Sequence, residues 1–96
     1  MSFIDKIAGY AQEVGNKGNV LPSVIIAQAI LESNWGRSGL SQKANNLFGI
    51  KGTGNAGSVS MKTLEHLSGK DVSIKAGVRA YKSMRDSIDD LVSLYN

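Results

Sequence analysis

Cysteine is absent from this chain and histidine occurs only once, as His66, so the common soft ligands of protein metal sites are almost missing. Disulfides and thiolate–metal centres are therefore excluded. A single histidine does not provide the ligand spacing of a zinc site. We interpret His66 as a surface residue.

Long apolar runs are missing as well. No stretch approaches the roughly 20 apolar residues of a membrane span. Residues 1–5 lack a basic segment followed by an apolar one, which predicts no signal peptide in this chain. The formal net charge of +3 mildly favours an anionic partner and is too small to indicate nucleic-acid binding.

The 96 residues that are present suffice for one small domain, residues 1–96, with a single modest core. Helical spacing of apolar residues predicts an amphipathic helix over residues 3–14. Ser2 and Asp5 form a capping box at its start. Residues 15–19 are predicted to end this helix and to form a loop.

A second helix is predicted to begin at Pro22, a residue suited to the first helical turn. Residues 22–31 are apolar nearly all the way round, which predicts a central helix buried on every side. Gly36 is its predicted C-terminal cap. A short helical turn over residues 38–43 and a last helix from about Ser83 complete the helical part.

Between these helices the sequence becomes rich in glycine and then alternates between apolar and polar residues. This pattern predicts a β-hairpin over about residues 57–80 with a tight turn at residues 67–70. The predicted fold class is therefore α+β, mainly α, with a small β-hairpin lobe.

Glu32 stands out because it closes the apolar helix. An anion at a helix C-terminus is disfavoured by about 0.3–1 kcal/mol, so the position suits a structural carboxylate poorly. Apolar neighbours are expected to desolvate the group and raise its pKa. A carboxylic acid that stays protonated near neutral pH is what general acid catalysis of glycoside cleavage requires. The alternative is a solvated glutamate at a frayed helix end.

Glu65 is the second acidic residue of interest. Asp71 is explained as a turn residue. Five of the eight acidic residues are explained as lying on solvated helix faces, namely Asp5, Glu13, Asp86, Asp89 and Asp90. Glu65 remains, on an extended arm beside the glycine-rich segment. A fixed acid on one wall and a second carboxylate on a facing arm are typical of a glycosidase cleft.

Two runs of sequence resemble a known family. Residues 21–52 read LPSVIIAQAILESNWGRSGLSQKANNLFGIKG, and residues 63–83 read TLEHLSGKDVSIKAGVRAYKS. Both are similar to segments of the peptidoglycan β-N-acetylglucosaminidases, which include bacterial autolysins, the flagellar rod-cap hydrolase and phage wall-degrading domains. The resemblance extends over residues 3–95 in the family's order.

This resemblance implies a lysozyme-like fold with a substrate groove between a helical lobe and a small β-lobe. It implies hydrolysis of the β-1,4 bond between N-acetylglucosamine and N-acetylmuramic acid in a peptidoglycan glycan strand, without a metal or organic cofactor. Glu32 matches the family's general acid and Glu65 its second acidic residue. The residues that match groove positions are Trp35, Asn46, Phe48 and Tyr81.

The residues alone leave their roles open. Trp35 suits either sugar stacking or core packing, whereas core packing is favoured for Phe48. Asn46 suits either a hydrogen bond to an acetamido group or ordinary turn chemistry. Tyr81 suits either the groove or its buried support. Glu65 is either a base that activates water or a stabiliser of charge while the substrate's own acetamido group assists.

Alternative functions are a muramidase or lytic transglycosylase on the same fold, and a non-catalytic domain for peptidoglycan binding or for assembly. The sequence departs from the family at Val78, where phenylalanine is usual, and lacks a tryptophan after Asn55. It also stops at Asn96, before the family's Tyr-Ala-Thr-Asp-Pro region. We therefore expect that the chain lacks the family's C-terminal part and that an uncovered apolar face allows self-association. A wall substrate predicts action outside the cell, or delivery by a phage.

Overall fold

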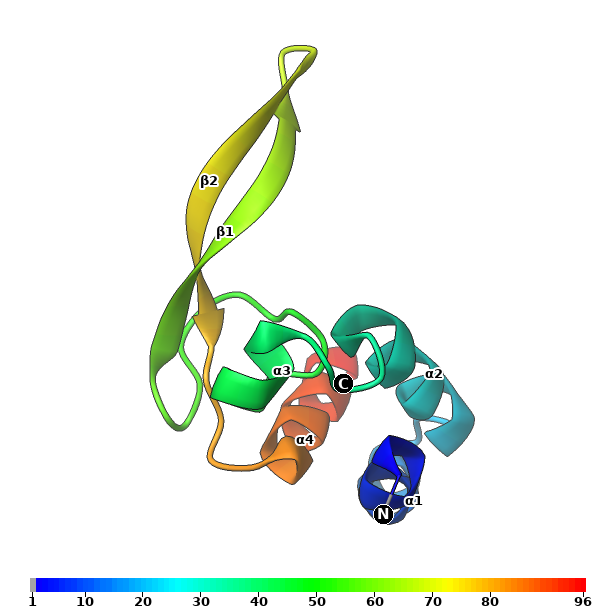
Figure 1. Cartoon of the computed structure of the whole chain (residues 1–96). Coiled ribbons are helices and arrows are strands. Elements are labelled where there is room, and N and C mark those ends of the chain that lie inside the picture. Colours follow the sequence, from blue (N-terminus) through cyan, green and yellow to red (C-terminus); the bar gives the residue numbers. More distant parts are fainter. Residues whose placement is uncertain (1) are drawn as a thin grey trace.

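The computed structural model describes residues 2–96, except for the side chains of residues 61–67, 72 and 74. Four helices and one hairpin follow each other along the chain (Figure 1). Their bounds are α1 Phe3–Gly18, α2 Pro22–Ser33, α3 Gly39–Ala44, β1 Ser58–Leu67, β2 Lys70–Arg79 and α4 Met84–Tyr95. This α+β arrangement, mainly helical, confirms the predicted fold class.

Helix α1 begins as the sequence predicts and ends later. The Ser2 hydroxyl accepts a hydrogen bond from the amide of Asp5 at 3.1 Å, and the Asp5 side chain caps the Ser2 amide in return. The helix continues to Gly18, so the loop predicted over residues 15–19 is wrong. Gly15 lies inside the helix, at a point where a Cβ would lie 2.6 Å from the carbonyl oxygen of Val20. This glycine permits the backbone at Val20 to approach α1 closely, and it does not end the helix.

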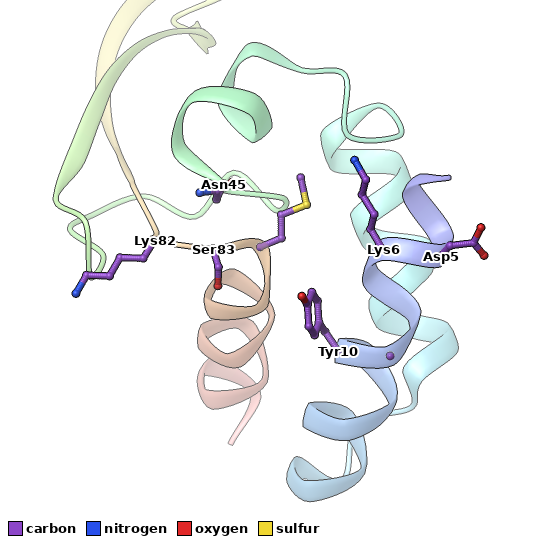
Figure 2. A pocket seen from close by; sticks show the side chains of 8 residues that line it. Asp5, Lys6, Tyr10, Asn45, Lys82 and Ser83 are labelled. Atoms are coloured by element: carbon purple, nitrogen blue, oxygen red, sulfur yellow. The ribbon is translucent and has the colours of Figure 1, made fainter. Parts of the chain in front are cut away.

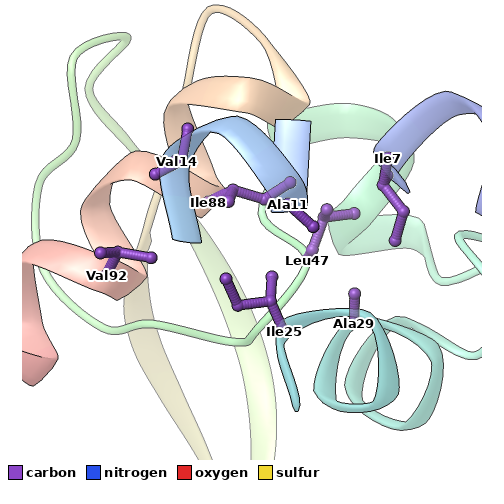
Figure 3. Close-up of a cluster of buried hydrophobic side chains, with 8 residues drawn as sticks. All are labelled: Ile7, Ala11, Val14, Ile25, Ala29, Leu47, Ile88 and Val92. Atoms are coloured by element: carbon purple, nitrogen blue, oxygen red, sulfur yellow. The ribbon is translucent and has the colours of Figure 1, made fainter. Parts of the chain in front are cut away.

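The hydrophobic core lies where α1, α2 and α4 meet the segment after α3 (Figure 3). Its buried members come from all four parts of the chain and interdigitate in one cluster. They are Ile7, Ala11, Val14, Ile25, Ala29, Leu47, Ile88 and Val92. Burial of such side chains contributes roughly 1.5–3 kcal/mol each for the larger aliphatic ones, so this cluster holds the three long helices together.

Helix α2 begins at Pro22 as predicted, but its predicted burial on every side is wrong. Ile25 and Ala29 point into the core, whereas Leu21, Val24 and Leu31 are exposed. Apolar periodicity identifies surface that prefers burial, and within the described residues only one face of α2 has a partner. The self-association expected through this open face stays a prediction.

The β-hairpin confirms the predicted segment and turn. Strands β1 and β2 pair antiparallel from Ser58 with Arg79 to Leu67 with Lys70, around the two residues Ser68 and Gly69. The strands extend away from the helical body, which gives the molecule one long dimension of 41 Å against 25 and 24 Å (Figure 1). The interpretation of His66 as a surface residue concerns a side chain outside the described residues.

Candidate active site

Glu32 lies one residue before the end of α2, in a helix terminus with many local hydrogen bonds. The hydroxyl of Ser33 donates to the carbonyl oxygen of Ala29 and accepts from the amide of Gly36 at 2.8 Å. Asn34 adopts the left-handed conformation, with a φ of 51°, and its amide bonds back to the last turn of the helix. Asn34, not the predicted Gly36, is therefore the C-terminal cap, and the backbone around Glu32 is fixed.

The side chain of Glu32 is exposed, so the predicted apolar enclosure is wrong. The apolar residues of α2 are either turned into the core or, like Leu31 at 80% exposure, lie in solvent themselves. Within the described part of the chain, no hydrogen bond or ion pair holds the carboxyl group. Glu32 is thus available to a ligand. Only a bound ligand would remove water from its carboxyl group.

Trp35 lies three residues after Glu32 in the chain and adopts a rare backbone conformation. Its φ is 59°, between the positive φ values of Asn34 and Gly36. A bulky residue in this region is strained, and such strain concentrates at functional sites. The side chain is 48% exposed, which disfavours core packing and suits stacking against a sugar ring.

Asn46 is buried at 1% exposure and its amide is fully engaged inside the protein. Its Nδ2 donates to the carbonyl oxygens of Ile50 at 3.0 Å and Arg79 at 2.8 Å. Its Oδ1 accepts from the amides of Phe48 and Ile50, both at 3.2 Å. Of its two interpretations, the structure favours loop support over contact with an acetamido group.

Phe48 and Tyr81 also lie against the interior of the protein. Phe48 is half-buried and packs against the core cluster, in agreement with the packing interpretation. Tyr81 is 4% exposed, follows the end of β2, and donates its hydroxyl to Asp90 at 2.5 Å. Among the residues predicted to line or support a groove, Trp35 is therefore the one whose side chain is largely open to solvent.

Asp90 is a residue that sequence reasoning missed. It was expected on the solvated face of the last helix, but its Oδ2 also lies 2.7 Å from Nη1 of Arg79. The interpretation as a solvated face is wrong for Asp90. Its partners lie 9 and 11 residues away, at the end of β2 and just after it, so no local pattern in the sequence marks the contact.

Tyr81 provides a spectroscopic test of this buried cluster. Burial raises the pKa of the Tyr81 phenol, and the hydrogen bond to Asp90 raises it further. The phenolate absorbance that distinguishes wild type from Tyr81→Phe is expected only above the ordinary tyrosine pKa of about 10. The folded pKa exceeds the unfolded one, so the stability contributed by the protonated phenol is fully present below about pH 10 and is lost as the pH rises through the folded value. Titration of Tyr81 at the ordinary value would contradict the arrangement.

Glu65 lies on β1, where its backbone pairs with Val72. Its side chain is outside the described residues, so its role as the second carboxylate stays a prediction. Among the residues that the structure describes, no cluster of metal-ligating side chains is present.

A surface cavity of about 520 Å³ lies elsewhere, between α1, α4 and the end of α3 (Figure 2). Tyr10 of α1 lies on the side facing α4, whereas Lys82 points away from α1. None of the predicted site residues lines this cavity. The described residues therefore leave Glu32 and Trp35 on an open surface.

A helical body with a two-stranded antiparallel hairpin, and a glutamate at the end of a helix, is the lysozyme-like architecture of solved glycoside hydrolase domains. The chain belongs to the glucosaminidase family described as mannosyl-glycoprotein endo-beta-N-acetylglucosaminidase, whose model matches residues 8–96. This membership agrees with the resemblance read from the sequence.

Three relatives illustrate the family. The exo-glucosaminidase LytG of Bacillus subtilis is 50% identical over 93 residues, which are 97% of this chain and 33% of that protein. A probable N-acetylmuramidase of Lactococcus lactis subsp. lactis is 49% identical over 93% of this chain and 20% of its own length. The catalytic domain of the autolysin Auto from Listeria monocytogenes has a TM-score of 0.89 and 46% identity, over 95% of this chain and 52% of that chain.

The chain thus spans a third or less of these two curated relatives and about half of the Listeria domain. No helix among the described residues is long and apolar enough to cross a membrane.

Proposed function

We propose that this chain cleaves the β-1,4 bond between N-acetylglucosamine and N-acetylmuramic acid in bacterial peptidoglycan. The observation that carries the proposal is an exposed glutamate, Glu32, with no partner among the described residues, three positions before the strained, exposed Trp35 on a chain of the glucosaminidase family. Trp35 offers a flat apolar surface to a sugar ring, and Glu32 offers a proton to the bond next to it.

In the proposed reaction Glu32 donates its proton to the glycosidic oxygen as that oxygen leaves. The sugar carbon gains the character of an oxocarbenium ion, and water completes the hydrolysis. Glycan bound over Glu32 excludes water and so favours the protonated carboxyl group, which the free protein does not enclose. Glu65 either activates the water, with carboxyl groups about 6.5–9.5 Å apart, or stabilises charge while the acetamido group assists.

The second candidate is a muramidase on the same fold. It is favoured by the Lactococcus relative, which is named as a probable N-acetylmuramidase and is as similar to this chain as LytG. Both candidates place the substrate in the bacterial wall, so the proposed site of action is extracellular.

Product analysis tests the proposal. Purified peptidoglycan is incubated with the protein, and the new reducing ends are identified by mass spectrometry. We expect N-acetylglucosamine at these ends. N-acetylmuramic acid would support the muramidase, and an anhydro sugar would indicate a lytic transglycosylase. Sedimentation of the protein with wall material without any new ends would replace the catalytic proposal with a binding function.

A further inference from the structure

The hairpin is held to the helical body mainly at its base. The end of β2 bonds to the segment between α3 and β1, through the amide of Arg79 to the carbonyl oxygen of Ile50 at 2.8 Å and the amide of Gly52 to that of Gly77 at 3.1 Å. Beyond this base the strands extend away from the helices (Figure 1). The direction of the hairpin therefore depends on contacts at the base.

Two side-chain contacts link this base to α4. In the first, the side-chain amide nitrogen of Asn55 donates to Asp86 at 3.0 Å between exposed groups. In the second, one carboxylate oxygen of Asp90 accepts hydrogen bonds from the guanidinium of Arg79 at 2.7 Å and from the hydroxyl of Tyr81. The second contact therefore ties the last residue of β2, Arg79, and a residue just after the strand, Tyr81, to α4.

Several hydrogen bonds restrict the geometry of the contact between Asp90 and Arg79. Nε of Arg79 also donates to the carbonyl oxygen of Lys51 at 3.0 Å, so the guanidinium bridges α4 and the loop before the hairpin. Side-chain exposures of 26% and 27% for Arg79 and Asp90 place the ion pair in a partly desolvated position. Charge-assisted hydrogen bonds of this kind are short and directional. Loss of one partner leaves the others partly buried without a counterpart, which is costly.

We propose that Asp90 is a positioning residue, which sets the direction of the hairpin that carries Glu65 relative to the helix that carries Glu32. The inference rests on the proposed function for its catalytic consequence, and on the contacts above for its structural one. A displacement of about 1 Å between reacting groups lowers a rate by up to about 100-fold, so the direction of the hairpin controls turnover.

Distance measurement between spin labels tests the structural part. The chain has no cysteine, so Gln12→Cys on α1 and Ser60→Cys near the base of β1 introduce two unique exposed label sites. Double electron–electron resonance is recorded for this pair alone and with Asp90→Asn, which keeps the size of the side chain and removes its charge. We expect a broadened or shifted distance distribution for Asp90→Asn. An unchanged distribution would overturn the inference.

Asp89→Asn is the matched control. It removes the same charge one residue earlier, where the side chain is 50% exposed and lies 3.7 Å from Arg85. We expect the wild-type distance distribution and kcat for this variant. A change equal to that of Asp90→Asn would mean that the charge of α4 matters and not the contact with the hairpin, which would also overturn the inference.

Kinetics test the catalytic part. Asp90→Asn is expected to lower kcat on peptidoglycan about tenfold or more with a smaller change in KM, and Asp90→Glu is expected to recover part of it. If the wild-type protein does not cleave peptidoglycan while Asp90→Asn still alters the distance distribution, the proposed function fails and the positioning role stands. If the wild type cleaves and neither quantity responds to Asp90→Asn, the positioning role fails alone.

Discussion

Replacement of Glu32 by glutamine is expected to lower kcat on peptidoglycan by about 10²–10⁴-fold, the usual contribution of a general acid. Glutamine has nearly the same shape but does not protonate the leaving oxygen. Glu32 is exposed and makes no hydrogen bond or ion pair within the described residues, so this change removes no contact that holds the fold together. Loss of wall lysis, followed by turbidity and by new reducing ends, should therefore occur in a protein with unchanged thermal unfolding.

Glu13→Gln provides the control for removal of one negative charge. Glu13 is also exposed and lies on α1, where its carboxylate pairs with Arg85 at 2.8 Å. We expect wild-type activity for this variant within about twofold, together with a small loss of stability, as is usual for a surface ion pair. Lysis retained by Glu32→Gln would remove the assignment of Glu32, and equal loss in both variants would point to charge and not to acid catalysis.

Much of the fold could be predicted because its signals are local. Pro22 marks the start of α2, Ser2 with Asp5 marks that of α1, and Ser83 accepts a hydrogen bond from the Asp86 amide at the start of α4. The hairpin turn was also predicted, since two residues that accept positive φ separate alternating runs. In each case the residues that specify the element are its own neighbours in the chain.

Burial and tertiary contacts could not be predicted in the same way. The apolar pattern of α2 shows that its side chains favour burial, but it does not show which face of the helix packs against another element. Leu31 is apolar and nevertheless exposed. Glu32 was expected to be desolvated by the same pattern and is exposed. Gly15 was expected to end α1, yet it serves a close contact with Val20 that only the packed chain reveals.

In the candidate site, too, local features could be predicted from the sequence and tertiary contacts could not. Glu32 was singled out because a carboxylate is disfavoured at a helix C-terminus, and Trp35 because it matches a groove position of the family that the sequence resembles. Both roles stay predictions. The left-handed conformation that presents Trp35 was not foreseen, since tryptophan rarely adopts it. Asp90 was missed because its role arises from Arg79 and Tyr81, which approach it only after the hairpin has folded back to α4.

Asn46→Ala is the second change expected to have a large effect, and it acts on stability. The side chain satisfies four backbone groups, two carbonyl oxygens and two amides, in a buried position. Each polar group left unsatisfied costs about 1–3 kcal/mol, and groups in one network fail together. We expect the free energy of unfolding to fall by about 3–5 kcal/mol, measured by urea denaturation with a wild-type m-value.

Two further variants identify the cause of this loss. Asn46→Asp keeps the size and the acceptor oxygen, but it replaces the Nδ2 donor that serves Ile50 and Arg79 with a carboxylate oxygen facing their carbonyls. It is expected to destabilise the protein as strongly as alanine, which a simple cavity effect does not explain. Asn16→Ala, on the exposed side of α1, is expected to change the free energy of unfolding by less than about 0.5 kcal/mol. If Asn46→Ala unfolds at the wild-type urea concentration, the loop and the hairpin base do not depend on this amide, and the support assigned to Asn46 is incorrect.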